Sequence, residues 1–160
     1  MSHAFVFEVS NEVERRTSDL PDHCYGSICD YYMALEPDVR KKAIAMLGNS
    51  IQQIVKINPE TSEMKAEFTP EAIQDYFESD YLEFMKWLST LQKEATREAF
   101  AGDNVSRLAW ALNMLRDTFY GDCTYIFDTD QEELNTLEWW LRGLEPGDQF
   151  YVGTVWDYHF

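Results

Sequence analysis

The end of the chain constrains the fold most, because Gln149 to Tyr158 alternates two sets of side chains in the manner of a β-strand. One face would carry Phe150, Val152, Thr154, Trp156 and Tyr158, and the other Tyr151, Gly153, Val155 and Asp157. A second strand is predicted at residues 3–9 (HAFVFEV), a short apolar segment bounded by Ser10-Asn11. Being so early, it needs partners from later in the chain, so the sheet joins distant segments.

The middle of the chain has the pattern of a β-hairpin. The segment IVKINPETSEMKAEF alternates apolar and polar side chains on both sides of its turn-forming centre, NPETS. We therefore expect strands at residues 54–58 and 63–68. A continuous helix over residues 44–54 is the competing interpretation, and Gly48-Asn49 in its middle argues against it.

Helices are predicted where apolar residues recur at spacings of three and four and where capping signals occur. Thr69-Pro70 is such a start, because the hydroxyl can cap a helix and proline at the first position loses no useful hydrogen bond. The expected helices span residues 27–35, 37–48, 70–101, 104–119 and 130–142. The 70–101 helix has a break near residue 79 as its alternative. The 104–119 helix is apolar on two sides, which is typical of a central helix.

These elements do not alternate as the strands and helices of a doubly wound parallel sheet do. The predicted strands lie at residues 3–9, 54–58, 63–68, 123–127 and 149–158. We expect an α+β fold with a mostly antiparallel sheet of about five strands, packed against helices on one face. With 160 residues and 45% hydrophobic content, the chain is long enough for one well-buried core, and we expect a single globular domain over residues 1–160.

The charge balance indicates which partners are favoured. The chain has 29 acidic and 13 basic residues, a formal net charge of −16. Such a charge opposes binding to nucleic acid and to acidic lipid surfaces, and it favours a basic protein surface. Residues 117–160 contain ten carboxylates and Arg142 as their basic residue, and six acids without a base lie between Lys65 and Lys86. The alternative is that the acidity serves solubility alone.

Cysteine usage and hydropathy indicate a cytoplasmic setting. The three cysteines, Cys24, Cys29 and Cys123, cannot all pair within one chain, and no apolar region precedes a small-residue cleavage site near Met1. No run approaches the roughly 18 apolar residues that a membrane-spanning helix needs.

Motifs for metal or cofactor chemistry are weak. His23, Cys24 and Cys29 are ligand types for zinc, but they lack the second ligand pair of a structural zinc site, so we expect no metal and no cofactor. Glycine patterns for phosphate or dinucleotide binding and the G-x-S-x-G elbow are absent. A small enzyme remains an alternative, because Cys123, His159 and Asp157 supply a nucleophile, a base and an orienting group.

The clearest candidate for partner binding is the predicted helix 130–142. Its leucines define a buried face, which places Trp139 on the opposite side near Glu132, Asn135 and Thr136. An outward tryptophan among acids resembles an interaction anchor with a charged rim, although another segment could instead cover it. A second acidic face is predicted at Glu71, Asp75 and Glu78, and the alternative is that these residues are simply a solvated surface.

The sequence thus favours a non-enzymatic acidic protein that blocks a basic surface of a partner, as an inhibitor, an immunity protein or a phage-type nucleic-acid mimic does. The partner could itself be a nucleic-acid-binding protein. One alternative is the small enzyme with its site near Asp157, His159 and Cys123. Another is an assembly subunit whose strand Gln149 to Tyr158 pairs across an interface, provided that this strand lies at a sheet edge.

Overall fold

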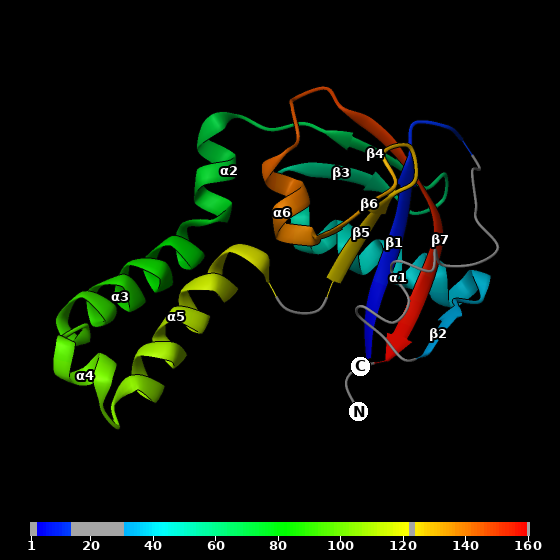
Figure 1. Ribbon diagram of the computed structural model, residues 1–160. Helices are drawn as coiled ribbons and strands as arrows, with labels where there is room; N and C mark the ends of the chain where they lie inside the picture. The colour runs from blue at the N-terminus through cyan, green and yellow to red at the C-terminus, as the bar shows by residue number, and fades with distance from the viewer. Residues whose placement is uncertain (1–2, 14–30, 122–123, 160) are drawn as a thin grey trace.

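The computed structural model describes residues 3–13, 31–121 and 124–159. Over these ranges the chain forms an α+β structure, with a seven-stranded mixed sheet and a helical arm that extends beyond it (Figure 1). The elements in order are β1 (His3–Ser10), β2 (Tyr31–Ala34), α1 (Pro37–Ile51), β3 (Val55–Asn58), β4 (Glu63–Ala66), α2 (Pro70–Tyr76), α3 (Glu78–Glu94), α4 (Arg97–Ala101), α5 (Val105–Tyr120), β5 (Thr124–Asp128), β6 (Glu133–Thr136), α6 (Leu137–Arg142) and β7 (Gln149–His159).

The long C-terminal strand β7 lies inside the sheet and organises it. Along one side it pairs antiparallel with β1, and along the other side it pairs first with β4 and then with β2. Strand β1 pairs in parallel with β5, and β6 completes that end of the sheet by pairing antiparallel with β5. Because β7 has partners on both sides, it does not meet the condition set for its pairing across an interface, which was a position at a sheet edge.

A buried arginine of α1 provides hydrogen-bond donors for the part of β7 that lies between the segments paired with β4 and β2. The Arg40 side chain of α1 donates to the carbonyl oxygens of Val152 at 2.6 Å and Gly153 at 2.8 Å. It also donates to the Ser62 hydroxyl at 3.0 Å, at the turn between β3 and β4. Buried carbonyls need a partner, so Arg40 supplies the donors where no strand continues the ladder.

The main core lies between the sheet and the two helices α1 and α6. Helix α1 contributes Ala43, Ile44, Leu47 and Ile51, while α6 contributes Leu137, Trp140 and Leu141. These side chains pack against strand residues that include Phe7, Val9, Met64, Ile126, Val152 and Val155. Both helices therefore cover the same face, as the sequence predicts. Ala4, Val6, Phe127, Trp156 and Tyr158 form a second buried cluster. They are strand residues that alternate along the chain with those of the main core.

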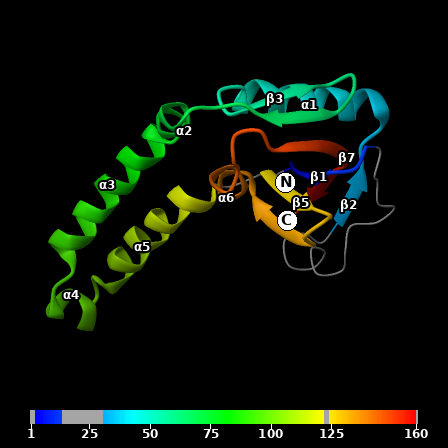
Figure 2. The same cartoon turned by 90° about the horizontal axis from the view of Figure 1, so that it is seen from above.

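The arm is an antiparallel pair of helices, α3 and α5, joined by the short α4 (Figures 1 and 2). Its own small core contains Trp87, Ala111 and Leu115, with partly buried apolar neighbours around them. Near its far end, Arg107 and Glu94 form an ion pair at 2.7 Å. In the described part of the chain, the arm joins the rest of the structure at its base, where α2 contacts α3 and α6 contacts α5.

Several sequence predictions are confirmed. The α+β class, the helix from Pro37 and the hairpin of β3 and β4 are all present. The sheet has seven strands instead of about five. The predicted helix 27–35 is wrong where the structure describes it, since Tyr31–Ala34 is a strand that pairs with β7. Its aromatic residues favour a pleated surface, and helical spacing in so short a segment also fits alternation.

The predicted helix 130–142 is also wrong in its first half. That half is a turn followed by β6, and only Leu137–Arg142 is helical. Pairing with β5 overrides the helical spacing of the apolar residues, and Thr136 caps α6 by accepting a hydrogen bond from the Trp139 amide.

The remaining corrections concern the arm. The predicted helix 70–101 is three helices, with one break at Phe77, close to the alternative break near residue 79, and another at Ala95-Thr96. The Thr96 hydroxyl caps α4, which is a stop-and-start signal that the sequence contains. The predicted central helix 104–119 is α5, which packs on α3 with one face and exposes the other.

Candidate partner-binding surface

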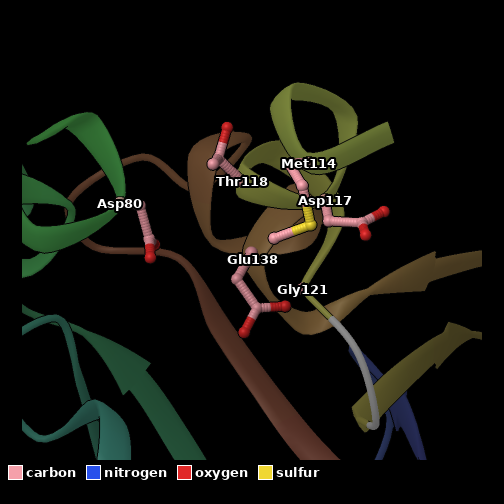
Figure 3. Close-up of a pocket in the computed structure, with 6 residues that line it drawn as sticks. All are labelled: Asp80, Met114, Asp117, Thr118, Gly121 and Glu138. Carbon is pink, nitrogen blue, oxygen red and sulfur yellow. The ribbon is translucent and has the colours of Figure 1, made fainter. Parts of the chain in front are cut away.

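An open pocket of about 630 Å³ lies where the base of the arm meets α6 (Figure 3). It is lined by Asp80, Met114, Asp117, Thr118, Gly121 and Glu138, from α3, the end of α5 and α6. Figure 3 shows the Asp80 and Glu138 side chains with Met114 beside Glu138, whereas the Asp117 carboxylate points away from the other two. We call this opening the acidic pocket.

Glycine at the end of α5 allows Glu138 to approach the arm. Gly121 adopts φ of 61° and ψ of −169°, a conformation that is essentially restricted to glycine. A Cβ at this position would also collide with the Glu138 carboxylate. The same residue therefore ends α5 and leaves room for one of the pocket's charges.

Arg142 connects α6 with the arm through hydrogen bonds to the end of α5. Arg142 donates to the carbonyl oxygens of Phe119 at 2.5 Å and Thr118 at 3.4 Å, in the last turn of α5. Its guanidinium also lies over the Phe77 ring, 4.1 Å from the ring centroid. Burial lowers the pKa of Arg142, while Asp80 and Glu138 act in the opposite direction. Arg142 thereby fixes the helix that carries Glu138.

The pKa of a nearby tyrosine, Tyr76, reflects the negative charge of the acidic pocket. The pKa of Tyr76 is raised above its usual value of 10.0, first by burial and then by the charges of Glu138 and Asp80. The Arg142 charge partly opposes this shift. Both carboxylates therefore act on the same space, as expected for charges that face one opening.

An exposed aromatic pair borders the acidic pocket. The rings of Tyr120 and Trp139 stack with centroids 5.5 Å apart and an angle of 27°. The two residues are 42% and 48% exposed, and they directly adjoin the pocket residues Gly121 and Glu138 in sequence. We call the set of Asp80, Glu138, Tyr120 and Trp139 the acidic-aromatic surface.

The structure separates the residues of the predicted helical face. Trp139 is 48% exposed, which agrees with the first of the two alternatives that the sequence leaves open. Glu132 lies in the turn before β6 with φ of 55°, and Asn135 and Thr136 belong to β6. The expectation that these residues share a helical face with Trp139 is wrong, because its premise, a helix starting at residue 130, does not hold.

The residues of the second predicted acidic face are exposed, but they belong to two different helices. Glu71 and Asp75 lie on α2, whereas Glu78 begins α3 after the break at Phe77. Asp80 and Glu138 were not singled out by the sequence, and their only visible signal was the acidity of their segments. Their proximity depends on how α6 docks on the arm, which no local pattern encodes.

Only part of the alternative enzyme site lies among the residues that the structure describes. Asp157 lies in β7 between Phe5 of β1 and Met33 of β2. Cys123 and the His159 side chain lie outside the described part of the chain, as do His23, Cys24 and Cys29. Among the residues that the structure does describe, no group of three His, Cys, Asp or Glu side chains could hold a metal ion.

Comparisons of the chain with protein-family models, with curated proteins and with solved structures each returned no match. Within residues 3–13, 31–121 and 124–159, every helix is too short or too polar to cross a membrane.

Proposed function

We propose that this protein is a non-enzymatic acidic binding protein that blocks a basic surface of a partner protein through the acidic-aromatic surface. The observation that carries the proposal is the position of Asp80 and Glu138 at one open pocket beside the exposed Tyr120–Trp139 stack. Carboxylates and aromatic faces are the two groups that recognise a guanidinium or an ammonium. An inhibitor, an immunity protein or a nucleic-acid mimic would each use such a surface.

The mechanism combines steering with a local anchor. The net charge of −16 draws a basic partner toward the protein over a distance set by ionic strength. At contact, an arginine or lysine of the partner enters the acidic pocket and meets Asp80 and Glu138. The ring of Trp139 then excludes water from the rim, as large aromatic residues do at interaction hot spots.

Neutralising the two pocket carboxylates tests this mechanism. The variant Asp80→Asn/Glu138→Gln should bind a short arginine- and lysine-rich peptide at least about 10-fold more weakly, because charged interface pairs contribute about 1.5 kcal/mol or more. Isothermal titration calorimetry measures the dissociation constant at low and high salt.

A matched control distinguishes the effect of the pocket carboxylates on peptide binding from the effect of net charge. The variant Glu36→Gln/Asp38→Asn removes two exposed carboxylates before and within α1, far along the chain from the pocket residues. It should bind the peptide almost as the wild type does. Equal weakening by both variants would show that the peptide responds to net charge only, and it would contradict the proposed site.

A further inference from the structure

The Tyr120–Trp139 stack and the Glu138 carboxylate meet at one junction between α5 and α6. Tyr120 directly precedes Gly121 in the sequence, and Trp139 directly follows Glu138. Gly121 and Glu138 are also close together, because a Cβ added to Gly121 would collide with the Glu138 carboxylate. Two successive contacts, ring on ring and carboxylate on glycine, therefore join the end of α5 to the first turn of α6. They place aromatic rings beside one of the carboxylates of the acidic pocket.

The stacked rings keep much of their surface open to solvent. In the stack each ring covers part of one face of the other, yet Tyr120 stays 42% exposed and Trp139 stays 48% exposed. Aromatic surface is therefore available to a ligand at the rim of the acidic pocket.

The base of the arm already holds one guanidinium with aromatic rings and oxygen atoms. The Arg142 guanidinium lies 4.1 Å from the Phe77 ring centroid and 6.0 Å from the Phe119 ring centroid. It also donates to the carbonyl oxygens of Phe119 at 2.5 Å and Glu138 at 3.2 Å. A planar guanidinium can use ring faces and oxygen acceptors at the same time. Arg142 therefore shows, within this molecule, how the two kinds of group hold an arginine.

The charges around the acidic pocket leave room for one further cation. Burial lowers the pKa of Arg142 and the charges of Asp80 and Glu138 oppose that shift, so the three charges interact. Two carboxylates and one guanidinium leave one net negative charge among these residues. The Asp117 carboxylate points away from them (Figure 3). A single cationic side chain of a partner would neutralise the remaining charge.

We propose that the acidic pocket selects an arginine of the partner over a lysine. The guanidinium pairs with the carboxylates of Asp80 and Glu138, and its flat face packs on the Tyr120–Trp139 stack. This inference rests on the proposed function, for which it specifies the side chain that the partner presents. The basic partner is then one whose contact surface carries an exposed arginine.

A lysine would use only part of this site. Its ammonium is compact and strongly hydrated, so it can pair with a carboxylate but has no flat face to stack on a ring. A guanidinium donates through a fork of five N–H groups, which can contact more than one carboxylate. Asp80 and Glu138 come from different helices, α3 and α6, and the rings lie beside Glu138. This combination favours arginine.

A pair of peptides tests the preference. One is a lysine-rich peptide with a single central arginine, and the other has lysine at that position, so the two have the same length and charge. Isothermal titration calorimetry should give a dissociation constant at least about 5-fold lower for the arginine peptide, in keeping with the strength of a cation–π contact at an exposed site.

Variants of Trp139 determine whether the ring causes the preference. Trp139→Leu keeps apolar bulk without an aromatic face, so it should bind the two peptides equally, whereas Trp139→Phe should retain part of the preference. Phe100→Ala is the matched control, because Phe100 is 75% exposed on α4 at the far end of the arm (Figure 1). This control should keep the full preference. Circular dichroism verifies that all three variants keep their helices.

The outcomes distinguish this inference from the proposed function. If Asp80→Asn/Glu138→Gln weakens binding of both peptides but the wild type binds the two equally, the binding site stands and the arginine preference is overturned. A full preference that survives in Trp139→Leu overturns the stacking on Trp139. If the neutralised variant binds both peptides as the wild type does, the proposed function fails, and the arginine preference fails with it.

Discussion

At the scale of single residues, the base of the arm depends on two positions that each have two roles. Gly121 ends α5 and leaves space for the Glu138 carboxylate. Arg142 donates hydrogen bonds to carbonyl groups in the last turn of α5 and thereby holds α6 beside that helix. The position of the acidic pocket therefore follows from backbone conformation and from the contacts of one arginine as much as from its carboxylates.

Replacing Gly121 should affect both stability and binding. We expect Gly121→Ala to lower the free energy of unfolding by about 1–3 kcal/mol, because an L side chain is strained at this backbone conformation. The new methyl group should also displace the flexible Glu138 side chain and weaken binding of the arginine- and lysine-rich peptide. Chemical denaturation and calorimetry measure the two effects.

Gly147→Ala is the control for Gly121→Ala. Gly147 also has a positive φ, of 101°, but a Cβ there would have open space around it. This variant should lose stability through backbone strain and keep its affinity for the peptide. If Gly121→Ala leaves the affinity unchanged as well, the close approach of Gly121 to Glu138 has no role in binding.

The ionisation of Tyr76 reports on the acidic pocket. Its pKa is raised above 10.0 by burial and then by Glu138 and Asp80, so Glu138→Gln should lower that pKa. Because the folded protein holds this proton more tightly, the contribution to stability is complete below pH 10 and is lost as the pH rises through the folded pKa. Ultraviolet difference titration measures the shift, and Tyr76→Phe assigns the signal. A pKa that does not respond to Glu138→Gln would place that carboxylate away from Tyr76.

At the scale of elements, local signals predict some segments well and fail where tertiary pairing decides. The turn residues around Asn58-Pro59 are sufficient to specify the hairpin of β3 and β4. By contrast, β6 forms only because β5 offers an edge, and its own residues favour a helix start equally well. The apolar residues on two sides of α5 were visible in the sequence, but periodicity alone does not distinguish residues buried within a fold from residues that stay exposed.

The contact of α1 with β7 provides a prediction at this scale. Arg40→Met should lower the free energy of unfolding by about 3–5 kcal/mol, because it leaves the buried carbonyls of Val152 and Gly153 without their donors. Lys41→Met removes the same charge from the next residue, whose ion pair with Glu60 is exposed, and should cost about 1 kcal/mol or less. Urea denaturation distinguishes them, and equal losses would show that Arg40 contributes only its charge.

At the scale of the whole molecule, the sequence predicts the fold class and its acidity but not the arrangement of charge. The order of strands, with β7 between β1 on one side and β4 and β2 on the other, joins segments from both ends of the chain. The acidic pocket likewise unites Asp80 with Glu138, which are 58 positions apart in the sequence. Such proximity follows from packing, so single-sequence patterns could single out Trp139 as a candidate without identifying its acidic neighbours.

The central claim, that the acidic-aromatic surface binds a basic partner, is tested most directly by capture from native cell extract with three matched baits. The baits are the wild type, Trp139→Ala and Trp110→Ala, the last of which removes a tryptophan that is 53% exposed and contacts Trp87 on the arm. We expect the wild type and Trp110→Ala to retain the same basic protein at low salt and to release it as salt rises, whereas Trp139→Ala should not retain it. Retention of that protein by all three baits, or release that is independent of salt, would contradict the account.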